Sequence, residues 1–460
     1  MNGQKIKKEI DRRSFLRSTA AVGAGLVLSP AILGQTGGIE KADDINVALL
    51  GAGAQGKVLV DACMKMGTNS GIRFKAVCDI WAYNRDWVSK RLKAYRHENN
   101  TYMDYQEMLA NEKDLDAMII ATPDFWHAEH TIACLKAGLH VYCEKEMSNT
   151  LEGARQIVRA AKETGKLLQI GHQRRSNPRY IYCYEKLIKE AKLLGQITTI
   201  NGQWNRSKNA CEEIGWPKGS EIDGATLNKY GFESMQQFMN WRWYKGLGGG
   251  PIVDLGSHQI DVYSWFLEAN PKSVIAGGGT DYWKGRQWYD SVMAIYEYQT
   301  SQGAIRAFYQ TITTNSRAGY YEAFMGDEGM LNISEAGSSW DGIYRESWVL
   351  QEKWEKWVKN GYLKGTIEQE KKEPADTNAV MDSRATPPPP KYEMAVEFHD
   401  PYHKPHLENF FDAIRGKAKL NCPAEIGYET AVTVLKVNEA IQAGQKLEFK
   451  PEEFNPPTAG

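Results

Sequence analysis

The chain has 460 residues and a mass of 51.9 kDa, which is too long for one ordinary domain and indicates two or three. Its 56 Lys and Arg residues balance 57 Asp and Glu residues, so a net charge of -1 gives no electrostatic reason to expect a nucleic-acid partner. No apolar run reaches the ~20 residues of a membrane-spanning helix. The 14 Trp and 23 Tyr residues suit sugar recognition, although ordinary core packing uses them equally well. Composition therefore leaves a globular enzyme or binding protein.

The first 34 residues are predicted to be an export signal rather than part of the fold. Arg12 and Arg13 precede Ser-Phe-Leu and a mildly apolar run at residues 20–28, a pattern that resembles a twin-arginine (Tat) signal. The run is too short and too weakly apolar to span a membrane comfortably. After processing, the protein is expected to have no stable membrane insertion. We therefore expect a periplasmic or other extracytoplasmic protein, exported folded and with any bound cofactor. A chance basic and apolar N-terminus is the alternative.

Short apolar strands alternate with helices from residue 44 to residue 171, which predicts a doubly wound parallel sheet of the Rossmann type. The strands are expected at residues 45–50, 73–79, 117–121, 139–143 and 167–170. The helices are expected at residues 57–66, around Trp87 and Leu92, and at 128–137 and 151–164.

Residues 172–460 are predicted to form a second, α+β domain that completes an α/β protein. Long alternating stretches at residues 197–204, 292–298 and 304–313 indicate an open, mainly antiparallel sheet with helices on one face. The Pro-rich segment 371–390 is expected to be a surface linker, and residues 406–443 to form C-terminal helices. The exposed face of such a sheet makes a homo-oligomer an expectation.

Gly51, Gly53 and Gly56 form a GxGxxG loop between the first strand and the first helix. In this pattern the first glycine allows a tight turn, the second lets a pyrophosphate approach the backbone, and the third lets the helix pack on the strand. The phosphates would lie at the helix N-terminus, beside Ala54 and Gln55. The loop in this position predicts dinucleotide binding.

Asp79 ends the second predicted strand, where its carboxylate would accept hydrogen bonds from ribose hydroxyls. The same charge would repel a 2′-phosphate, which favours NAD over NADP. A helix N-cap is the alternative role for this residue.

Three further motifs occur in order along the chain. They are Ala-Thr-Pro-Asp-Phe-Trp-His at residues 121–127, Gly-Leu-His-Val-Tyr-Cys-Glu-Lys at 138–145 and Gly-Gly-Pro-Ile-Val-Asp-Leu-Gly-Ser-His at 249–258. With the glycine loop, these motifs resemble the Gfo/Idh/MocA oxidoreductases from residue 45 to about residue 330. Residues 406–443 resemble the C-terminal helices of that family.

The resemblance implies a bound NAD and a substrate site between its nicotinamide and the face of the open sheet. The cofactor-binding residues implied by the motifs are Gly51, Gly53, Ala54, Gln55, Gly56, Asp79, Thr122, Pro123, Trp126, His127, Glu144, Lys145 and Gln173. The residues proposed to contact a sugar are Arg174, Trp204, Arg206, Trp241, Arg242, Tyr282 and Trp283. No metal is expected, because His172, His403 and His406 show no ligand spacing with an acid, and no two cysteines have CxxC spacing.

Lys145 matches the catalytic lysine of the family, and Asp254 and His258 match its Asp-x-x-x-His pair. Residues four apart share one helix face, so the last two can approach one substrate hydroxyl. A histidine is a natural base near neutral pH, and a lysine cation stabilises a developing alkoxide. Without the family context, a buried His258 and a solvated Lys145 would be the simpler interpretation.

The sequence departs from the family at Glu146, where a proline is expected after the lysine. Proline would fix the backbone. Its replacement leaves the direction of Lys145 open and makes Glu146 a candidate partner for the lysine charge.

The predicted function is that of an exported NAD-dependent carbohydrate oxidoreductase acting on a secondary hydroxyl of a sugar or glycoside, with ring carbon 3 expected. A compartment without a soluble NAD pool implies tightly bound NAD, recycled by a second keto-sugar. NAD-dependent glycosidases of the same family are the first alternative, but Lys145 favours net redox chemistry. A non-catalytic sugar-binding protein on the same fold is the second.

Overall fold

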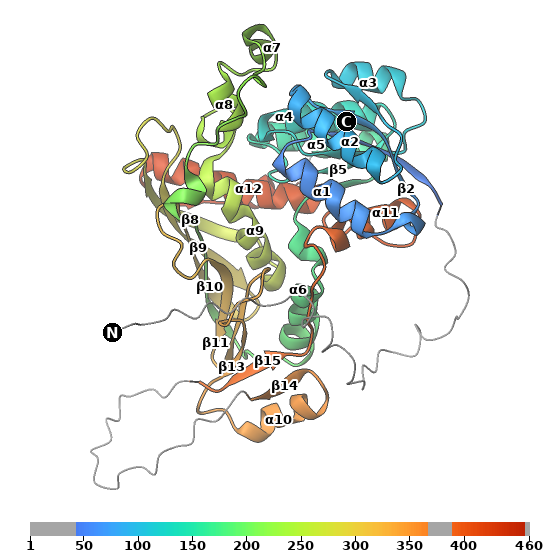
Figure 1. Ribbon diagram of the computed structural model, residues 1–460. Coiled ribbons are helices and arrows are strands. Elements are labelled where there is room, and N and C mark those ends of the chain that lie inside the picture. Colours follow the sequence, from blue (N-terminus) through green and yellow to red (C-terminus); the bar gives the residue numbers. More distant parts are fainter. Residues whose placement is uncertain (1–42, 367–388, 456–460) are drawn as a thin grey trace, which may run out of the picture. The chain divides into compact units, whose positions relative to one another are not determined.

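The computed structural model describes residues 43–366 and 389–455 (Figure 1). The predicted export signal and residues 371–388 of the predicted linker lie outside the described residues. Within the described ranges, no helix combines the length and apolar character needed to cross a bilayer.

The first domain contains, in the described part of the chain, a six-stranded sheet in which every pair of neighbouring strands is parallel. The strand order is β3-β2-β1-β4-β5-β6, so the order reverses between β1 and β4, where doubly wound sheets bind their ligands. The strands are β1 (Ile45–Leu50), β2 (Ile72–Cys78), β3 (Asn100–Tyr102), β4 (Ala117–Ile120), β5 (His140–Cys143) and β6 (Leu168–Ile170). The helices are α1 (Ala54–Lys65), α2 (Ala82–Ala94), α3 (Tyr105–Asn111), α4 (Asp124–Lys136) and α5 (Leu151–Thr164), with the short turn η1 (Thr68–Ser70). The predicted Rossmann arrangement is confirmed. The sequence missed β3, because its Asn-Thr-Tyr stretch is exposed and carries no apolar run.

The second domain contains, within the described residues, a ten-stranded sheet in which only the pair β7–β10 is parallel. Its order is β14-β15-β13-β12-β11-β7-β10-β9-β8-β16. The strands are β7 (Ile197–Asn205), β8 (Pro271–Gly279), β9 (Ser291–Thr300), β10 (Gly303–Ile312), β11 (Tyr320–Gly326), β12 (Gly329–Ile333), β13 (Gly342–Arg345), β14 (Leu363–Thr366), β15 (Lys391–Met394) and β16 (Leu447–Glu448). The predicted open, mainly antiparallel sheet is confirmed.

The helical segments that follow β6 are α6 (Pro178–Tyr182), η3 (Cys183–Glu190), α7 (Gly224–Lys229), α8 (Met235–Met239), α9 (Gly250–Leu267), α10 (Gln351–Lys359), α11 (Lys404–Ile414) and α12 (Ala424–Ala443). Of these, α9 and α12 pack on the second sheet. Short turns are η2 (Gln173–Ser176), η4 (Lys208–Cys211), η5 (Trp241–Trp243) and η6 (Pro451–Phe454). Strand β9 buries every second residue, as period-2 alternation requires, and packs on α9. The buried Tyr296 hydroxyl of this strand also donates to the Thr433 carbonyl oxygen of α12 at 3.2 Å. Because α12 also packs on α5 and β6, it joins the two domains.

Helix α11 packs into the core of the first domain, although it follows the strands of the second domain along the chain. Its Leu407, Phe410 and Phe411 are buried against Val47 and Leu59. An apolar helix face shows in the sequence, but the surface that it covers does not.

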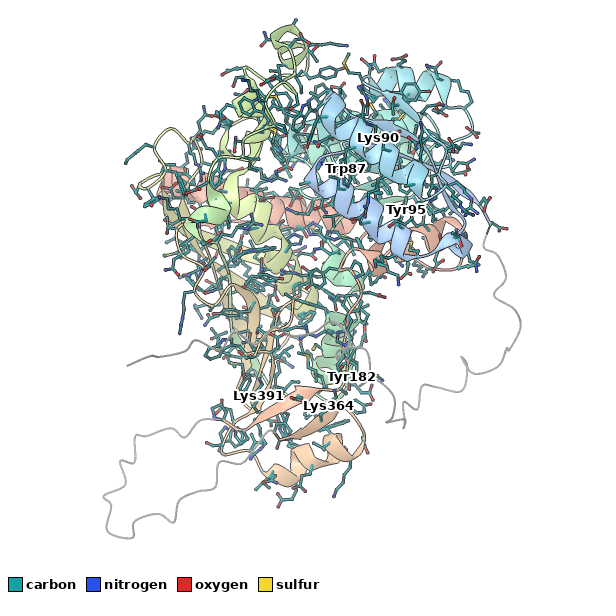
Figure 2. The ribbon with its side chains drawn as sticks, in the orientation of Figure 1. Trp87, Lys90, Tyr95, Tyr182, Lys364 and Lys391 are labelled. Atoms are coloured by element: carbon teal, nitrogen blue, oxygen red, sulfur yellow. The ribbon has the colours of Figure 1, made fainter. Side chains whose placement is uncertain are left out.

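Aromatic side chains also occur on the outer surface of the first domain. Figure 2 shows Trp87 and Tyr95 beside α2, where they are 42% and 47% exposed. The Arg91 guanidinium lies 5.5 Å and 5.7 Å from the two ring centroids. These residues form cation–π contacts on the surface of the first domain.

Arg174, which the sequence placed among the sugar contacts, is instead buried within the second domain, with 1% of its surface exposed. Its guanidinium pairs with Glu322 of β11 and lies 3.8 Å from a carboxylate oxygen of Glu335. Tyr180 donates to the other oxygen of Glu322 at 2.7 Å. Burial raises the pKa of Glu322 to about 7, because Arg174 offsets only part of the cost of burying the carboxylate. Arg174 is therefore a structural cation.

We expect Arg174→Met to lower the free energy of unfolding by about 3–5 kcal/mol, because it leaves Glu322 buried without its cation. Chemical denaturation measures the loss. The matched control is Arg306→Met on the exposed side of β10, where a change within about 0.5 kcal/mol is expected. Equal midpoints for the two variants would contradict the structural role.

His406 connects α11 to the end of β6, and its protonation makes the stability of the folded protein depend on pH. Its Nε2 lies 2.9 Å from the Ile170 carbonyl oxygen and its Nδ1 lies 2.6 Å from the Ser176 hydroxyl. Burial lowers the pKa of His406 to about 3, so the folded protein holds it neutral.

Stability should fall as the pH drops below about 6.5, where an unfolded histidine takes up the proton that folded His406 refuses. The expected loss is about 1.4 kcal/mol per pH unit for each such group, continuing down to the folded pKa. His406→Gln should reduce the slope of unfolding free energy against pH between 6 and 4.5 by about 1.4 kcal/mol per pH unit, which corresponds to the uptake of one proton. An unchanged slope would show that His406 does not contribute.

Candidate active site

The glycine loop joins β1 to α1 in the geometry that its sequence predicts. Gly51 has φ +98°, and a Cβ there would lie 2.6 Å from the Ala121 backbone. A Cβ on Gly56 would lie 2.1 Å from the Gly51 carbonyl oxygen, so helix and strand are in close contact. No described atom lies within 4 Å of the place where a Gly53 Cβ would be. The first and third glycines thus serve packing, and the second leaves the backbone open to a ligand.

The N-terminus of α1 faces this opening. No described side chain caps the helix, so its first N–H groups are left for an anion. Asp79 accepts hydrogen bonds from the backbone N–H groups of Ala52, at 2.6 Å, and Trp81, at 2.7 Å. Burial raises the pKa of Asp79, and these two bonds oppose part of that rise. Each carboxylate oxygen keeps a second lone pair for a ribose hydroxyl, so the loop and the acid fit a dinucleotide. The N-cap of α2 is Trp81 rather than Asp79.

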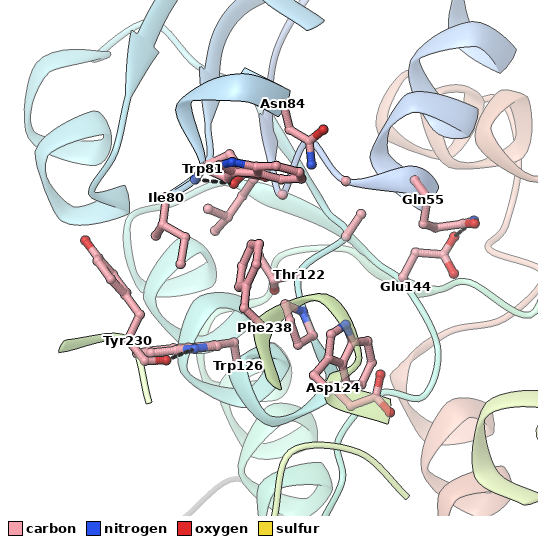
Figure 3. A pocket seen from close by; sticks show the side chains of 18 of the residues that line it. Gln55, Ile80, Trp81, Asn84, Thr122, Asp124, Trp126, Glu144, Tyr230 and Phe238 are labelled. Carbon is pink, nitrogen blue, oxygen red and sulfur yellow. Dashed lines mark hydrogen bonds between the residues drawn. The ribbon is translucent and has the colours of Figure 1, made fainter. Parts of the chain in front are cut away.

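Two adjoining cavities meet at the centre of the molecule. The first extends from the glycine loop along the first domain (Figure 3), and the second lies over one end of the second sheet. Residues that line both are Ala54, Gln55, Glu144, Lys145, Ile214 and Arg242. Of the predicted cofactor-binding residues, those that line the first cavity are Gly51, Gly53, Ala54, Gln55, Asp79, Thr122, Pro123, Trp126, Glu144 and Lys145. Gln173 lines the second cavity.

His127 does not line either cavity, although the sequence placed it beside the cofactor. Its two ring nitrogens each lie 2.7 Å from a carbonyl oxygen, of Thr122 and of Glu146. Two acceptors require two N–H groups, so the geometry calls for an imidazolium. Burial alone would lower the pKa of His127, but Cys143, Asp124 and the Glu146 carbonyl outweigh it and raise the pKa to about 9. His127 is therefore a buried structural cation.

Lys145 and Asp254 form an ion pair at the junction of the two cavities. The lysine Nζ lies 3.1 Å from Asp254 Oδ1 and also donates to the Asp254 carbonyl oxygen. Arg242 Nε donates to the same Oδ1 at 3.2 Å. Burial alone would raise the pKa of Asp254, but the charges of Lys145 and Arg242 hold it well below its usual range. The carboxylate stays ionised between two cations.

His258 follows Asp254 by one turn of α9, and both side chains line the second cavity. Its Nδ1 is buried and has no hydrogen-bond partner among the described residues. Burial, together with the charges of Lys145 and Arg174, holds the pKa of His258 well below 6.5. A neutral imidazole at the cavity is able to accept a proton.

Glu146 does not pair with Lys145, contrary to the interaction considered from the sequence. Its side chain is completely buried, and Oε1 accepts from the Met147 backbone N–H at 2.9 Å. In the described part of the chain, Oε2 has no partner. Burial raises the pKa of Glu146 to about 8, so the acid is largely protonated at neutral pH. The lysine is directed by Asp254 instead.

The predicted sugar contacts separate into three groups. Trp204, Arg206 and Arg242 line the second cavity, and Trp241 lines the first. Tyr282 and Trp283 line neither of these two cavities of the described residues, so their contact with a sugar stays a prediction. Tyr282 is half exposed, and the Trp283 ring donates to Thr313 at 3.0 Å and stacks under Arg286. An aromatic run shows in the sequence, but the direction of its side chains depends on the loop fold.

Several cavity residues were missed by sequence reasoning. They are Tyr320, Glu335, Tyr402 and His403. The Gln55 amide donates to Glu144 at 3.0 Å and lies 2.9 Å from His403 Nε2. Because His403 lies 348 residues from Gln55 in the chain, no local pattern reveals this contact.

No group of three His, Cys, Asp or Glu residues within the described ranges is placed to hold a metal ion.

The chain is similar to proteins of known family. The model for an oxidoreductase family with an NAD-binding Rossmann fold matches residues 45–172, and the model for that family's C-terminal alpha/beta domain matches residues 185–449. A scyllo-inositol 2-dehydrogenase (NADP(+)) from Bacillus subtilis is 29% identical over 240 residues, 52% of this chain and 56% of that protein. A 1,5-anhydro-D-fructose reductase from Ensifer adhaerens is 27% identical over 226 residues, 49% of this chain and 59% of that protein. The chain thus spans little more than half the length of these curated relatives.

Among solved structures, a levoglucosan dehydrogenase in complex with NADH has a TM-score of 0.65 and 18% identity, covering 89% of this chain and 100% of that one. This likeness extends over both domains and shows the fold. Because the two family models match in order from residue 45 to residue 449, the chain belongs to the Gfo/Idh/MocA family of oxidoreductases.

Proposed function

We propose that the protein is an NAD-dependent oxidoreductase that interconverts a secondary hydroxyl and a ketone on a sugar or glycoside. The observation that carries the proposal is the position of Lys145, Asp254 and His258. All three line a cavity that continues directly into the dinucleotide cavity. Family members similar to the chain include enzymes named for inositol and anhydrofructose, which supports a carbohydrate substrate.

The first domain supplies the residues that would hold the cofactor. The uncapped N-terminus of α1 offers its N–H groups to the pyrophosphate, and Asp79 offers carboxylate oxygens to a ribose. When bound, NAD would supply the acceptor for the hydride that leaves the substrate carbon.

His258 and Lys145 have different roles at the substrate oxygen. Oxidation of an alcohol removes the hydroxyl proton as well as the hydride, and neutral His258 is the base that takes this proton. The Lys145 ammonium group stabilises negative charge that develops on the oxygen. Asp254 holds that ammonium group in place through the 3.1 Å contact. In the reverse direction the hydride returns to the carbonyl carbon and the imidazolium returns the proton to the oxygen, so the ketone becomes an alcohol.

The second cavity is lined by aromatic and polar side chains, which suit the C–H faces and hydroxyls of a sugar. The Trp204 ring stacks on Tyr320 with 4.5 Å between ring centroids, which fixes a flat apolar platform. Glu335 and Gln173, joined by a 3.0 Å hydrogen bond, add polar groups on the same cavity. Ring carbon 3 is the position that we propose for the reaction.

We further propose that the protein is exported through its twin-arginine segment and carries tightly bound NAD. Arg12 and Arg13 before a mildly apolar run support the export route. A nucleotide loaded before export would be reoxidised in place by a second keto-sugar.

Self-association through the open sheet is also proposed. Ile275 of β8 lies opposite Ile295 of β9, and both are nearly half exposed, as is Met293. Such an apolar patch supports pairing with a second copy of the chain.

The function is tested by the absorbance of purified protein in the reduced-nicotinamide band before and after addition of a panel of glycosides. A substrate should raise this absorbance, and a keto-sugar should reverse the change. Lys145→Met should lower the rate about 10²- to 10⁴-fold. Trp340→Ala, on an exposed residue that lines neither cavity, is the matched control.

Other outcomes of this experiment select the alternatives. Release of free aglycone without accumulated keto-sugar would indicate a glycosidase. Sugar binding without any absorbance change, in the wild type as in Lys145→Met, would indicate a non-catalytic binding protein.

The pH profile tests His258 as the base. Because its pKa lies well below 6.5, kcat/KM should stay level from neutral pH through 6.5 and decline only at lower pH. Lys145→Met removes a cation that depresses this pKa, so the residual activity should decline at a higher pH than in the wild type. A wild-type decline centred near 6.5 would contradict the assignment.

A further inference from the structure

Residues 212–247, between β7 and α9, form a segment that we call the cover segment. It contains α7, α8 and η5, and it lines the first cavity with Ile214, Tyr230, Phe232, Phe238 and Met239 as well as Trp241 and Arg242. The second domain therefore supplies one wall of a cavity whose other wall is the first domain. Figure 3 shows Tyr230 and Phe238 across from Ile80 and Trp81.

Polar contacts fasten the cover segment to the first domain. The Trp126 indole donates to the Tyr230 carbonyl oxygen at 3.1 Å, and the Trp81 indole donates to the carbonyl oxygen of Ser220. Asp104 lies 3.0 Å from Lys229 Nζ and accepts from the Tyr230 hydroxyl at 3.2 Å. The contacts reach both α7 and the loop before it.

Apolar packing closes the same joint. Trp81 of the first domain shares a separate buried cluster with residues of the cover segment, namely Leu227, Tyr230, Phe232, Met235, Trp241 and Leu247. This cluster is distinct from the two larger cores of the described chain. The contact between the cover segment and the first domain thus has an apolar cluster of its own.

Asn240 makes the cover segment one unit. It is 5% exposed, accepts from the Ile214 backbone N–H at 2.8 Å and donates to the Ile214 carbonyl oxygen at 3.0 Å. Ile214, which lines both cavities, thus moves with the end of α8.

If phosphates bind at the glycine loop and a ribose binds at Asp79, the remaining part of the first cavity would be left for the nucleobase. The residues that line it there include Ile80 and Trp126 of the first domain and Phe238 and Met239 of the cover segment. Flat apolar walls suit a purine, which stacks well on aromatic rings.

We infer that the cover segment completes the adenine site of the dinucleotide and retains the nucleotide, so that release requires the segment to detach from Trp81, Trp126 and Asp104. This rests on the proposed NAD-dependent function for the identity of the ligand. The test uses no carbohydrate, so it is independent of oxidoreductase activity.

The release rate of NADH measures retention. Full-length protein loaded with NADH is mixed with excess NAD, and the loss of energy transfer from tryptophan to the reduced nicotinamide is followed. Phe238→Ala should release NADH about tenfold faster or more, because it removes an aromatic wall of the base site. Lys229→Ala, which removes the ion pair with Asp104, should accelerate release about two- to fivefold.

Matched controls remove similar groups elsewhere. Leu350→Ala removes an exposed apolar side chain, and Lys353→Ala removes the surface ion pair with Glu328. Both should release NADH at the wild-type rate. Thermal unfolding of each variant verifies the fold, and Phe238→Leu replaces Phe238→Ala if the latter does not fold.

The inference would be overturned if the Phe238 variant (Phe238→Ala or Phe238→Leu) and Lys229→Ala both released NADH at the wild-type rate. It would also be overturned if the wild-type protein exchanged NADH within the mixing time. If the wild-type protein releases NADH slowly, the variants release it faster and no sugar is oxidised, the inferred role of the cover segment is supported and the proposed function is contradicted. If sugars are oxidised but the variants release NADH at the wild-type rate, the proposed function is supported and the inferred role of the cover segment is contradicted.

Discussion

The ion pair between Lys145 and Asp254 connects the two halves of the site. Lys145 follows β5 of the first domain, whereas Asp254 lies on α9 of the second, so their 3.1 Å contact crosses the domain boundary. Both side chains are largely buried, and a buried charge that loses its partner is strongly destabilised. The pair therefore fixes where the lysine ammonium group lies relative to the cofactor loop. His258, one helical turn from Asp254, is positioned by the same helix. Because Lys145 and His258 line the same cavity, a substrate oxygen that contacts the lysine would also lie near the histidine.

Burial sets the protonation states around this pair, and it does so differently for neighbouring groups. His258 has cations nearby and a buried Nδ1 without a hydrogen-bond partner among the described residues, so its neutral form is favoured, as the proposed base requires. His127 has a carbonyl oxygen at each ring nitrogen and Asp124 close by, so it stays charged and serves as structure. Glu146, beside the lysine in sequence, is buried in a place that favours its neutral form. Sequence distance from Lys145 is thus a poor guide to chemical role.

The glycine loop could be predicted residue by residue, because its requirements are local: a positive φ at Gly51 and close packing at Gly56. The same holds for Asp254 and His258, whose shared face follows from helix geometry. Long-range contacts could not be predicted. Arg174 was assigned to the substrate because arginines bind hydroxyls, yet its partner Glu322 lies on a strand 148 residues away. His403 was missed for the same reason, since it reaches Gln55 from a helix start far along the chain.

The aromatic residues that are conspicuous in the composition serve two sites with different demands. At the second cavity, Trp204 stacks on Tyr320 and both rings line the space proposed for the substrate. At the first cavity, Trp81 packs edge-on to Phe238 and donates to Ser220, so aromatic surface is used to close the site. The proposed function would use this asymmetry, because a nucleotide that stays bound and sugars that exchange make opposite demands on the two cavities. The length of chain between β7 and α9 allows it, since the cover segment packs on Trp81 of the first domain while Trp204 and Tyr320 line the second cavity.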